Sequence, residues 1–217
     1  MKRVLIITGG KIEEAFVLEY LRQQEFELII AADSGIEFLY RNQIRPDILV
    51  GDFDSADREI VEYYRRNPKV EFREFQPEKD DTDTEIAMLL AIEKGATAIH
   101  LLGATGSRLD HMIANVLLLG LAAEKGIEAY LLDVQNRVRL IRERTVLRRE
   151  DQYGDYVSLI PFMGEVTGLT LEGFKYPLCD YTMKGFHSLG ISNEIAEPEA
   201  VITMETGWLI LVEARDE

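Results

Sequence analysis

The chain has 217 residues, of which 47% are apolar, and a formal net charge of −15 at pH 7. This apolar content suits one large or two small globular domains, whereas the acidic charge argues against nucleic acid, whose phosphates bind basic surfaces. Cys179 is the only cysteine, which excludes an intrachain disulfide, and no apolar segment approaches the ~20 residues of a membrane span, so a cytoplasmic protein without a membrane partner is expected.

Residues 1–135 alternate between short β-branched runs and helical patterns. The runs typical of strands are Val4–Ile7, Leu28–Ala32, Ile48–Val50, Val70–Phe75, Ala98–Leu102 and Ala129–Leu132. Helical spacing is followed by Ile86, Leu89, Leu90 and Glu93, and again by Ile113, Val116, Leu117 and Leu121. Gly95 and Gly126 are natural ends for these two helices. The pattern predicts an α/β domain whose mostly parallel sheet is flanked by helices.

Residues 136–217 show no convincing helical period and are punctuated by Gly, Pro and Asp. The runs typical of strands are Val138–Ile141, Tyr156–Ile160, Val166–Leu171, Ala200–Met204 and Trp208–Val212. The charged segment Arg142–Asp151 is compatible with a hairpin or with a linker. This part is predicted to be an all-β sandwich domain, separate from the first.

Carboxylates follow four of the predicted strands of the first domain. They are Asp33, the pair Asp52 and Asp54, the group Asp80, Asp81 and Asp83, and Asp110. Carboxyl ends of parallel strands share one edge of a sheet, where open α/β sheets bind ligands. In an extended chain, residues two apart point to the same side, so Asp52 and Asp54 are expected to share a ligand while Phe53 packs inward. Clustered anions need cations, and Mg²⁺ bound to a polyphosphate fits best.

Two glycine-rich segments could receive phosphates. The segments TGGK (Thr8–Lys11) and GATGS (Gly103–Ser107) each join a predicted strand to a helix, where free backbone N–H groups attract anions. Neither matches the P-loop, and no GxGxxG is present. Lys79 and Arg108 are placed to neutralise phosphates, with a solvated surface role as the equal alternative. For Asp81, Thr82 and Ser107, helix capping is the favoured alternative, because Thr82–Glu85 and Ser107–Asp110 have capping-box spacing.

The histidines do not suggest a nucleophilic mechanism. His100 lies within an apolar run and is expected to be a hydrogen-bonded core residue. His111 could orient the neighbouring Asp110, but packing at a helix start is the favoured interpretation. Substrate positioning together with metal electrostatics needs no protein nucleophile, and phosphoryl-type transfer proceeds in that way.

Five sequence blocks in order resemble the thiamine pyrophosphokinase family. They are DSG…PDILVGDFDS, KDDTDTEIAM, LLGATGSRLDHMIANV, LEGFKYPL and GISNE. The resemblance implies transfer of a pyrophosphoryl group from ATP to the hydroxyl of thiamine, which gives thiamine diphosphate and AMP. It also implies Mg²⁺ as cofactor, an ATP-binding domain followed by a thiamine-binding β-sandwich, and a homodimer with thiamine sites at the subunit interface.

The resemblance also implies roles for individual residues. Metal ligands would be Asp52, Asp54 and Asp83, which with Asp110 form the catalytic set; the base is left open among Asp54, Asp83 and Asp110. The implied ATP- and thiamine-binding residues are Asp33, Lys79, Asp80, Thr82, Thr105, Arg108, Asp110, Ser192, Asn193 and Trp208.

This sequence departs from the family pattern at three positions. Ser107 stands where glycine is frequent, and Lys79 stands where some members have Gln. Some family members have an aromatic residue that stacks on thiamine, and Trp208 resembles it but stands at a different position within the last strand. The favoured alternative to stacking on thiamine is that Trp208 packs in the core of its own domain. Two other functions remain in view: a Mg²⁺-dependent phosphotransferase with another alcohol acceptor, and a module that binds ATP or thiamine without turnover.

Overall fold

The computed structural model describes residues 2–53, 56–74, 81–106 and 108–216. The chain divides into two compact units, Met1–Val134 and Gln135–Glu217. None of the helices in the described ranges is long and apolar enough to cross a membrane.

The first unit is built on a parallel sheet. Its strands are β1 (Arg3–Ile7), β2 (Leu28–Ala32), β3 (Ile48–Gly51), β4 (Glu71–Glu74), β5 (Ala98–Leu102) and β6 (Glu128–Leu132). They lie in the order β4-β3-β2-β1-β5-β6, and each adjacent pair is parallel. From β1 the chain builds outward to β4, then returns to place β5 on the other side of β1. The strand order therefore reverses between β1 and β5.

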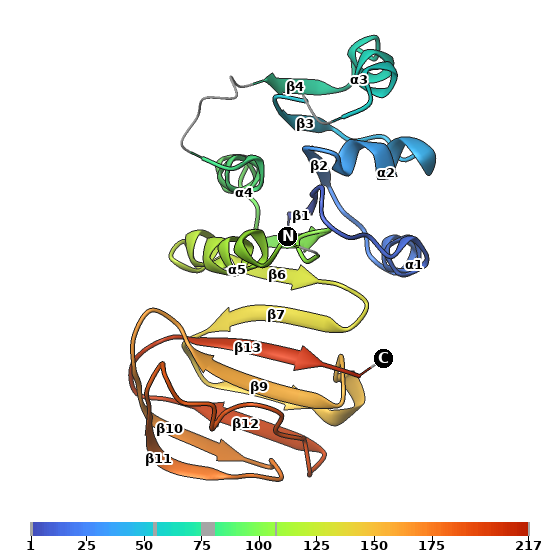
Figure 1. The fold of residues 1–217 in the computed structure, drawn as a ribbon. Helices are drawn as coiled ribbons and strands as arrows, with labels where there is room; N and C mark the ends of the chain where they lie inside the picture. The colour runs from blue at the N-terminus through green and yellow to red at the C-terminus, as the bar shows by residue number, and fades with distance from the viewer. Residues whose placement is uncertain (1, 54–55, 75–80, 107, 217) are drawn as a thin grey trace. The chain divides into compact units, whose positions relative to one another are not determined.

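Helices cover both faces of this sheet. They are α1 (Glu14–Gln23), α2 (Gly35–Arg41), α3 (Arg58–Arg65), α4 (Asp83–Glu93) and α5 (Leu109–Ala123). In Figure 1, α4 and α5 lie on one side of the sheet and α1, α2 and α3 on the other. Because both faces are covered, central strands such as Val4–Ile7 are buried along their whole length. The predicted α/β architecture is confirmed.

The two helices predicted from spacing are present, but their buried faces differ from the spaced positions. In α4 the buried residues are Ala87, Met88, Leu90 and Ala91, whereas Leu89 is 43% exposed. In α5 they are Asn115, Leu119 and Ala122, whereas Ile113 and Leu117 are about half exposed. The helix α4 packs against β1, β2 and β3 and also against α5, and its buried residues include the small Ala87 and Ala91, which the spacing did not single out.

The second unit consists of antiparallel strands in two sheets. Its strands are β7 (Asn136–Ile141), β8 (Thr145–Arg148), β9 (Tyr156–Pro161), β10 (Val166–Glu172), β11 (Leu178–Met183), β12 (Glu199–Thr203) and β13 (Leu209–Ala214). One sheet has the order β7-β13-β9 and the other β11-β10-β12-β8. Alternate side chains from both sheets, among them Leu169, Ile202 and Leu211, form one buried core. The predicted β-sandwich is confirmed.

Two segments of the second unit differ from expectation. Arg142–Asp151 is neither a hairpin nor a linker, because it contains β8 and a 3₁₀ turn (Arg149–Asp151), and β8 pairs with β12. The strand β11 was not predicted. It pairs with β10 alone and buries few of its side chains, so its sequence lacks a strong apolar alternation.

Candidate active site

A cavity of about 480 Å³ lies at the carboxyl edge of the first unit's sheet. It is lined by the loops that leave β1, β2 and β5, by the start of α4 and by the first two turns of α5. This is the position where the strand order reverses between β1 and β5, and open α/β sheets bind ligands at such switch points. The volume lies within the range of small-molecule sites.

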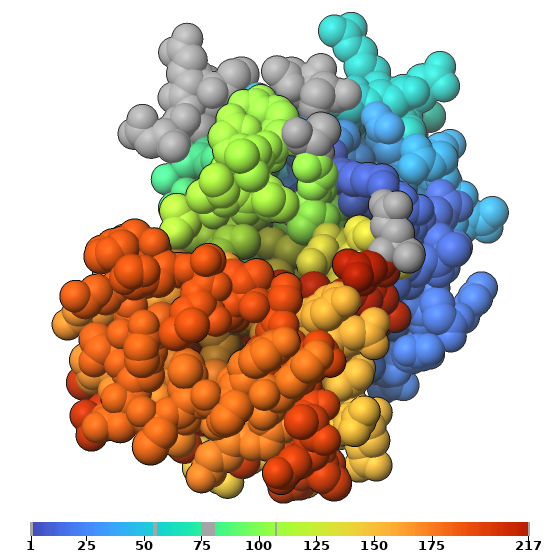
Figure 2. Space-filling view, turned by 60° about the horizontal axis from the view of Figure 1, so that its bottom comes forward, coloured from blue at the N-terminus to red at the C-terminus, as the bar shows by residue number. Residues whose placement is uncertain are grey.

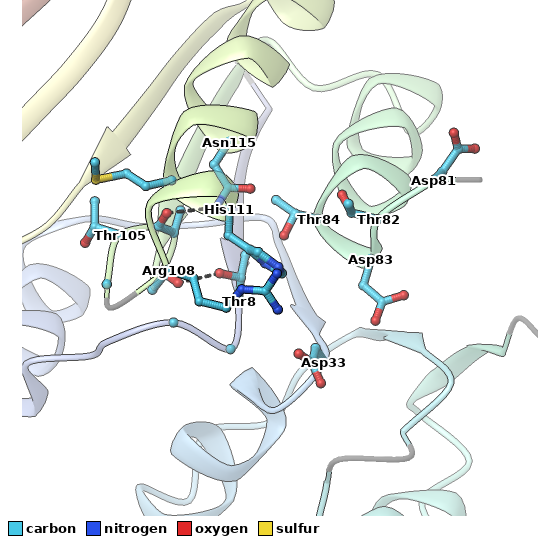
Figure 3. Close-up of a pocket in the computed structure, with 16 residues that line it drawn as sticks. Thr8, Asp33, Asp81, Thr82, Asp83, Thr84, Thr105, Arg108, His111 and Asn115 are labelled. Atoms are coloured by element: carbon cyan, nitrogen blue, oxygen red, sulfur yellow. Dashed lines mark hydrogen bonds between the residues drawn. The ribbon is translucent and has the colours of Figure 1, made fainter. Parts of the chain in front are cut away.

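The structure brings five predicted residues to this cavity. They are Asp33, Thr82, Asp83, Thr105 and Arg108. In Figure 3, Asp83 extends from the start of α4 toward Asp33, whereas Asp81 extends away from both. Residues from three distant segments therefore converge, as the shared carboxyl edge of the strands predicts.

Gly51 explains how the Asp83 carboxylate can lie close to β3. A Cβ atom at this position would be 3.3 Å from the Asp83 Oδ2 and 3.5 Å from the Asp33 backbone nitrogen. Its φ of 148° is also rare for residues with a side chain. Glycine at the end of β3 therefore leaves the space into which the Asp83 carboxylate fits.

Asp52 follows Gly51 directly and is partly buried, but it does not line the cavity. Phe53 is 7% exposed and contacts the Phe72 ring edge to face at 5.9 Å, so its inward packing is confirmed. However, Phe53 has a φ of 56°, which is left-handed rather than extended. The argument that Asp52 and Asp54 share a side because the segment is extended is therefore wrong. Asp54, Lys79 and Asp80 lie outside the described residues, as does Ser107.

Arg108 and Asp110 form a two-point ion pair at the start of α5. The Arg108 Nη2 and Nε donate to the two Asp110 carboxylate oxygens, at 2.6 and 3.2 Å. Both side chains are about two-thirds exposed, and only Arg108 lines the cavity. Hydrogen bonds from Arg108, and then from the His111 backbone N–H, lower the pKa of Asp110 to about 2. Asp110 is therefore a fixed anion that orients the guanidinium.

The two glycine-rich loops, residues 8–11 and 103–106, are hydrogen-bonded to each other. We call them the paired loops. The Gly10 N–H donates to the Gly103 carbonyl at 2.8 Å, and the Lys11 N–H donates to the Thr105 carbonyl at 2.9 Å. The expectation that the TGGK segment offers free N–H groups to phosphate is therefore wrong for Gly10 and Lys11, because the neighbouring loop uses them.

Thr82 is the N-cap of α4, as its spacing predicted. Its hydroxyl accepts a hydrogen bond from the Glu85 N–H at 3.2 Å, while the residue also lines the cavity. The cap fixes where α4 begins and therefore where Asp83, its first residue, stands.

Lining residues that were not among the predicted site residues include Thr8, Thr84, His111 and Asn115. His111 is exposed in the first turn of α5, so the favoured interpretation of helix-start packing is wrong. Asn115 follows it by one turn and is buried, and its Nδ2 donates to the Ala104 carbonyl at 2.7 Å. The sequence signal that could have identified Asn115 is a polar residue within an otherwise apolar helical segment, since such a residue is rarely buried without a hydrogen-bond partner.

His100 is a core residue, as predicted. Its Nδ1 is hydrogen-bonded to the Tyr20 hydroxyl at 2.5 Å, and the rings of Tyr20, Phe26 and Tyr130 lie within 6 Å of its own. Burial, and secondly the charge of Arg3, lower its pKa to about 4. The imidazole is therefore neutral near pH 7.

Three predicted residues belong to the second unit. Asn193 is buried, and its side chain donates to the Tyr176 carbonyl and accepts from the Tyr176 and Glu194 N–H groups, at 2.8 to 3.0 Å. Ser192 beside it is exposed with a φ of 57°. Trp208 is partly buried, and the Arg142 guanidinium lies over its ring at 4.8 Å from the centroid. Asn193 thus fixes the backbone that presents Ser192.

The cavity's donor set suits a hard cation bound together with phosphate. Among the described residues, no group of three His, Cys, Asp or Glu side chains could by itself hold a metal ion. Mg²⁺ commonly uses one or two carboxylates and takes its other oxygens from water and substrate phosphates. The carboxylates of Asp33 and Asp83, which line the cavity, are ligands of this type. Asp52, which follows Gly51, carries the same kind of ligand.

Two family models match the chain. "Thiamin pyrophosphokinase, catalytic domain" matches residues 20–131, and "Thiamin pyrophosphokinase, vitamin B1 binding domain" matches residues 144–209. Thiamine pyrophosphokinase from Bacillus subtilis is 34% identical over 195 residues, covering 88% of this chain and 89% of the relative. Thiamine pyrophosphokinase 3 from Oryza sativa is 26% identical, covering 76% and 64%.

Solved structures give the same result. The crystal structure of the Bacillus subtilis thiamine pyrophosphokinase has a TM-score of 0.89 at 30% identity, with all of both chains covered. Yeast thiamin pyrophosphokinase has a TM-score of 0.81 at 17% identity, with 98% of this chain and 86% of the yeast chain covered, which shows a shared fold.

Proposed function

Because the chain belongs to the thiamin pyrophosphokinase family and is a kinase that makes thiamine diphosphate, we propose the following roles for its residues in that reaction. The pyrophosphoryl group of ATP passes to the hydroxyl of thiamine, and AMP leaves. The observation that carries the assignment is the convergence of Asp33, Asp83 and Arg108 on one cavity at the sheet's switch point. Residues 1–135 bind ATP, and residues 136–217 bind thiamine.

ATP binds with its phosphates in the cavity between the paired loops and α4. Arg108 neutralises phosphate oxygens, while Thr82, Thr105 and Asp33 line the same space. A guanidinium held by two bonds to Asp110 has little rotational freedom left to lose when phosphate binds. Lys79 and Asp80 are assigned to ATP binding by sequence match.

Asp52, Asp54 and Asp83 hold Mg²⁺ together with the phosphates. When bound, the metal supplies positive charge that draws electron density from the β-phosphorus and stabilises the departing AMP. The protein's contribution is placement. The Thr82 cap and the missing side chain at Gly51 fix the Asp83 carboxylate at the sheet edge.

The general base is either Asp54 or Asp83. A base works best when its pKa is near the working pH, and Asp110 has a pKa of about 2. Its role is instead to hold Arg108 in position. This choice narrows the three carboxylates compatible with the sequence to two.

Thiamine binds to the second unit at the interface of a homodimer. Ser192 and Asn193 belong to this site, and Trp208 offers an aromatic face of the kind that attracts the cationic thiazolium, since Arg142 already lies over that ring. The loop before Ser192 supports pairing of two copies. Within it Phe186 is 81% exposed, and Leu189 and Ile191 are about half exposed. We assign the enzyme to the cytoplasm, with no nucleic-acid or membrane partner.

The product distribution tests the reaction. Incubation with thiamine, ATP and Mg²⁺ is expected to yield AMP and thiamine diphosphate in equal amounts. Removing the metal with EDTA is expected to stop both, and excess Mg²⁺ to restore them. Formation of ADP would indicate a phosphotransferase of another type. Calorimetric binding of both substrates without any product would indicate a binding module.

A further inference from the structure

Three consecutive carbonyl groups of the loop 103–106 are each held by a hydrogen bond from outside that loop. The Gly103 carbonyl accepts from the Thr8 hydroxyl at 2.5 Å and from the Gly10 N–H at 2.8 Å. The Ala104 carbonyl accepts from the Asn115 side chain at 2.7 Å, and the Thr105 carbonyl from the Lys11 N–H at 2.9 Å. The loop is thus clamped from β1's exit on one side and from α5 on the other.

The two side chains of this clamp are buried. Thr8 is 4% exposed and Asn115 is 8% exposed, although both line the cavity. Figure 3 shows them on separate elements, Thr8 after β1 and Asn115 on α5. A buried polar side chain that lost its partner would be costly, which keeps these bonds made. The hydrogen bonds therefore fix the orientation of the loop's peptide groups.

The directions of the held carbonyl groups also determine the directions of the neighbouring N–H groups. In a trans peptide the carbonyl of one residue and the N–H of the next point in opposite directions. The loop of residues 8–11 holds the Gly103 and Thr105 carbonyls, so the N–H groups of Ala104 and Gly106 face away from that loop. Asn115 holds the Ala104 carbonyl, so the Thr105 N–H faces away from α5. In the part of the chain that the structure describes, these three N–H groups make no hydrogen bond to the protein. Backbone N–H groups that have no protein partner and border a cavity can donate to an anion such as a phosphate.

We infer that Thr8 and Asn115 are positioning residues for ATP: by holding the Gly103 and Ala104 carbonyls, they fix the orientation of the adjoining N–H groups of Ala104 and Thr105, which remain available to the phosphates. The inference rests on the proposed function, because it takes ATP as the ligand of this cavity. It assigns the anion-binding N–H groups to the loop after β5, since those of Gly10 and Lys11 are already used. Neither Thr8 nor Asn115 needs to touch the nucleotide.

Thr8→Val tests the clamp, because valine keeps the shape and removes the hydroxyl. Thr8→Ser keeps the hydroxyl. Thr97→Val is the matched control, since the Thr97 hydroxyl also donates to a backbone carbonyl, that of Lys2, at the opposite end of β1 and β5. Binding is measured by calorimetry with Mg²⁺ and adenosine 5′-(α,β-methylene)triphosphate, whose α–β linkage cannot be cleaved in this reaction.

We expect Thr8→Val to raise the dissociation constant about tenfold, a difference of ~1.4 kcal/mol. Thr8→Ser should restore binding to within about twofold, and Thr97→Val should bind as the wild type does. In steady-state kinetics the KM for ATP should rise in Thr8→Val while the KM for thiamine stays constant. If Thr8 only stabilised the fold, its loss would not raise the KM for ATP while leaving the KM for thiamine constant.

Asn115→Leu provides a second variant in case Thr8→Val does not fold. Its matched control is Asn42→Leu, because the Asn42 side chain also donates to a backbone carbonyl, that of Phe38, at the end of α2. Equal binding by Asn115→Leu and Asn42→Leu would overturn the inference, as would equal impairment of Thr8→Ser and Thr8→Val. A wild-type chain that fails to bind the analogue would instead contradict the proposed function.

Discussion

Asp83 is the residue on which the proposed chemistry depends most directly. Asp83→Asn keeps the shape of the side chain and removes its charge, so binding of the metal and phosphates should weaken. We expect turnover to fall at least about a hundredfold, equivalent to ~2.7 kcal/mol of lost transition-state stabilisation. The fold should persist, because Thr82 still caps α4 and the charge adds at most about 1 kcal/mol at the helix start. AMP production and far-UV circular dichroism measure the two effects.

Asp155→Asn is the matched control for this change. Asp155 is exposed in the second unit and does not line the cavity, so its variant should turn over as the wild type does. If Asp83→Asn kept wild-type turnover, the assignment of Asp83 to the metal would be wrong.

His100 makes the free energy of unfolding depend on pH. Its pKa is about 4 in the folded chain and near 6.5 when unfolded, so the unfolded state binds the extra proton between these values. The contribution of neutral His100 to the stability of the folded chain is fully present above pH 6.5 and is lost as the pH falls toward 4. Between pH 7 and 4.5 the loss should be about 2 kcal/mol.

Urea unfolding at the two pH values measures this loss. His100→Gln should lose correspondingly less stability than the wild type on acidification. His111→Gln should behave as the wild type does, because His111 is exposed and lies outside the core. Equal acid sensitivity of His100→Gln and His111→Gln would show that His100 does not carry the effect.

At the residue scale, the sequence predicted the convergence of Asp33, Asp83 and Arg108 because parallel strands place their carboxyl ends on one edge. It could not predict that Phe53 has a left-handed backbone, since no local signal such as glycine marks the position. Nor could it predict the use of the Gly10 and Lys11 N–H groups. Their acceptors lie more than 90 residues away in the loop after β5.

At the element scale, the paired loops depend on glycine at position 10. A Cβ atom at Gly10 would lie 2.2 Å from the Gly103 carbonyl oxygen and 2.5 Å from that of Thr105. Since backbone atoms cannot rotate away as a side-chain end can, Gly10→Ala must separate the loops. We expect a loss of about 1–3 kcal/mol in the free energy of unfolding, as in overpacked cores, together with weaker ATP binding.

Denaturant unfolding and calorimetry measure these two changes. Gly164→Ala is the control, because a Cβ atom there would meet nothing within 4 Å. Should Gly10→Ala match Gly164→Ala in both stability and ATP affinity, the close approach of the paired loops would not matter for either property.

The elements themselves were predicted where burial is strong and missed where it is weak. The central strands read as continuous apolar runs because both of their faces are covered. The edge strand β11 pairs with β10 alone and leaves Cys179, Asp180 and Thr182 exposed. Its sequence therefore lacks the alternation of apolar and polar residues that would predict a strand. The spacing of α4 and α5 predicted helices but not their buried faces, because leucines such as Leu89 lie on the surface.

At the scale of the whole molecule, the strand order is the decisive feature that spacing alone cannot supply. The position of the cavity follows from the reversal between β1 and β5, and this reversal depends on which strands pair across the whole first unit. The reaction was predicted from the resemblance of the sequence blocks to a family. The strand order explains why the blocks of the first unit lie close together in space.

The loop of residues 184–191 exposes apolar side chains that a single chain does not cover. The segment around it forms part of the surface of the second unit (Figure 2), and Phe186 and Leu189 are 81% and 54% exposed. Apolar groups gathered in this way usually mark an interaction surface. Because Ser192 follows directly, a second copy that covers the loop would also enclose the proposed thiamine site.

Sedimentation equilibrium should therefore give twice the 24.8 kDa mass of one chain. The double change Phe186→Ser and Leu189→Ser removes apolar contacts worth about 1.5–3 kcal/mol for each buried side chain. We expect this variant to sediment as a single chain and to bind thiamine more weakly. It should keep its ATP affinity, because the residues that line the proposed ATP cavity all lie in the first unit. Met163→Ser, which alters an 82% exposed residue outside this loop, should remain a dimer. If the double variant also remained a dimer with unchanged thiamine affinity, the loop would not be the subunit contact.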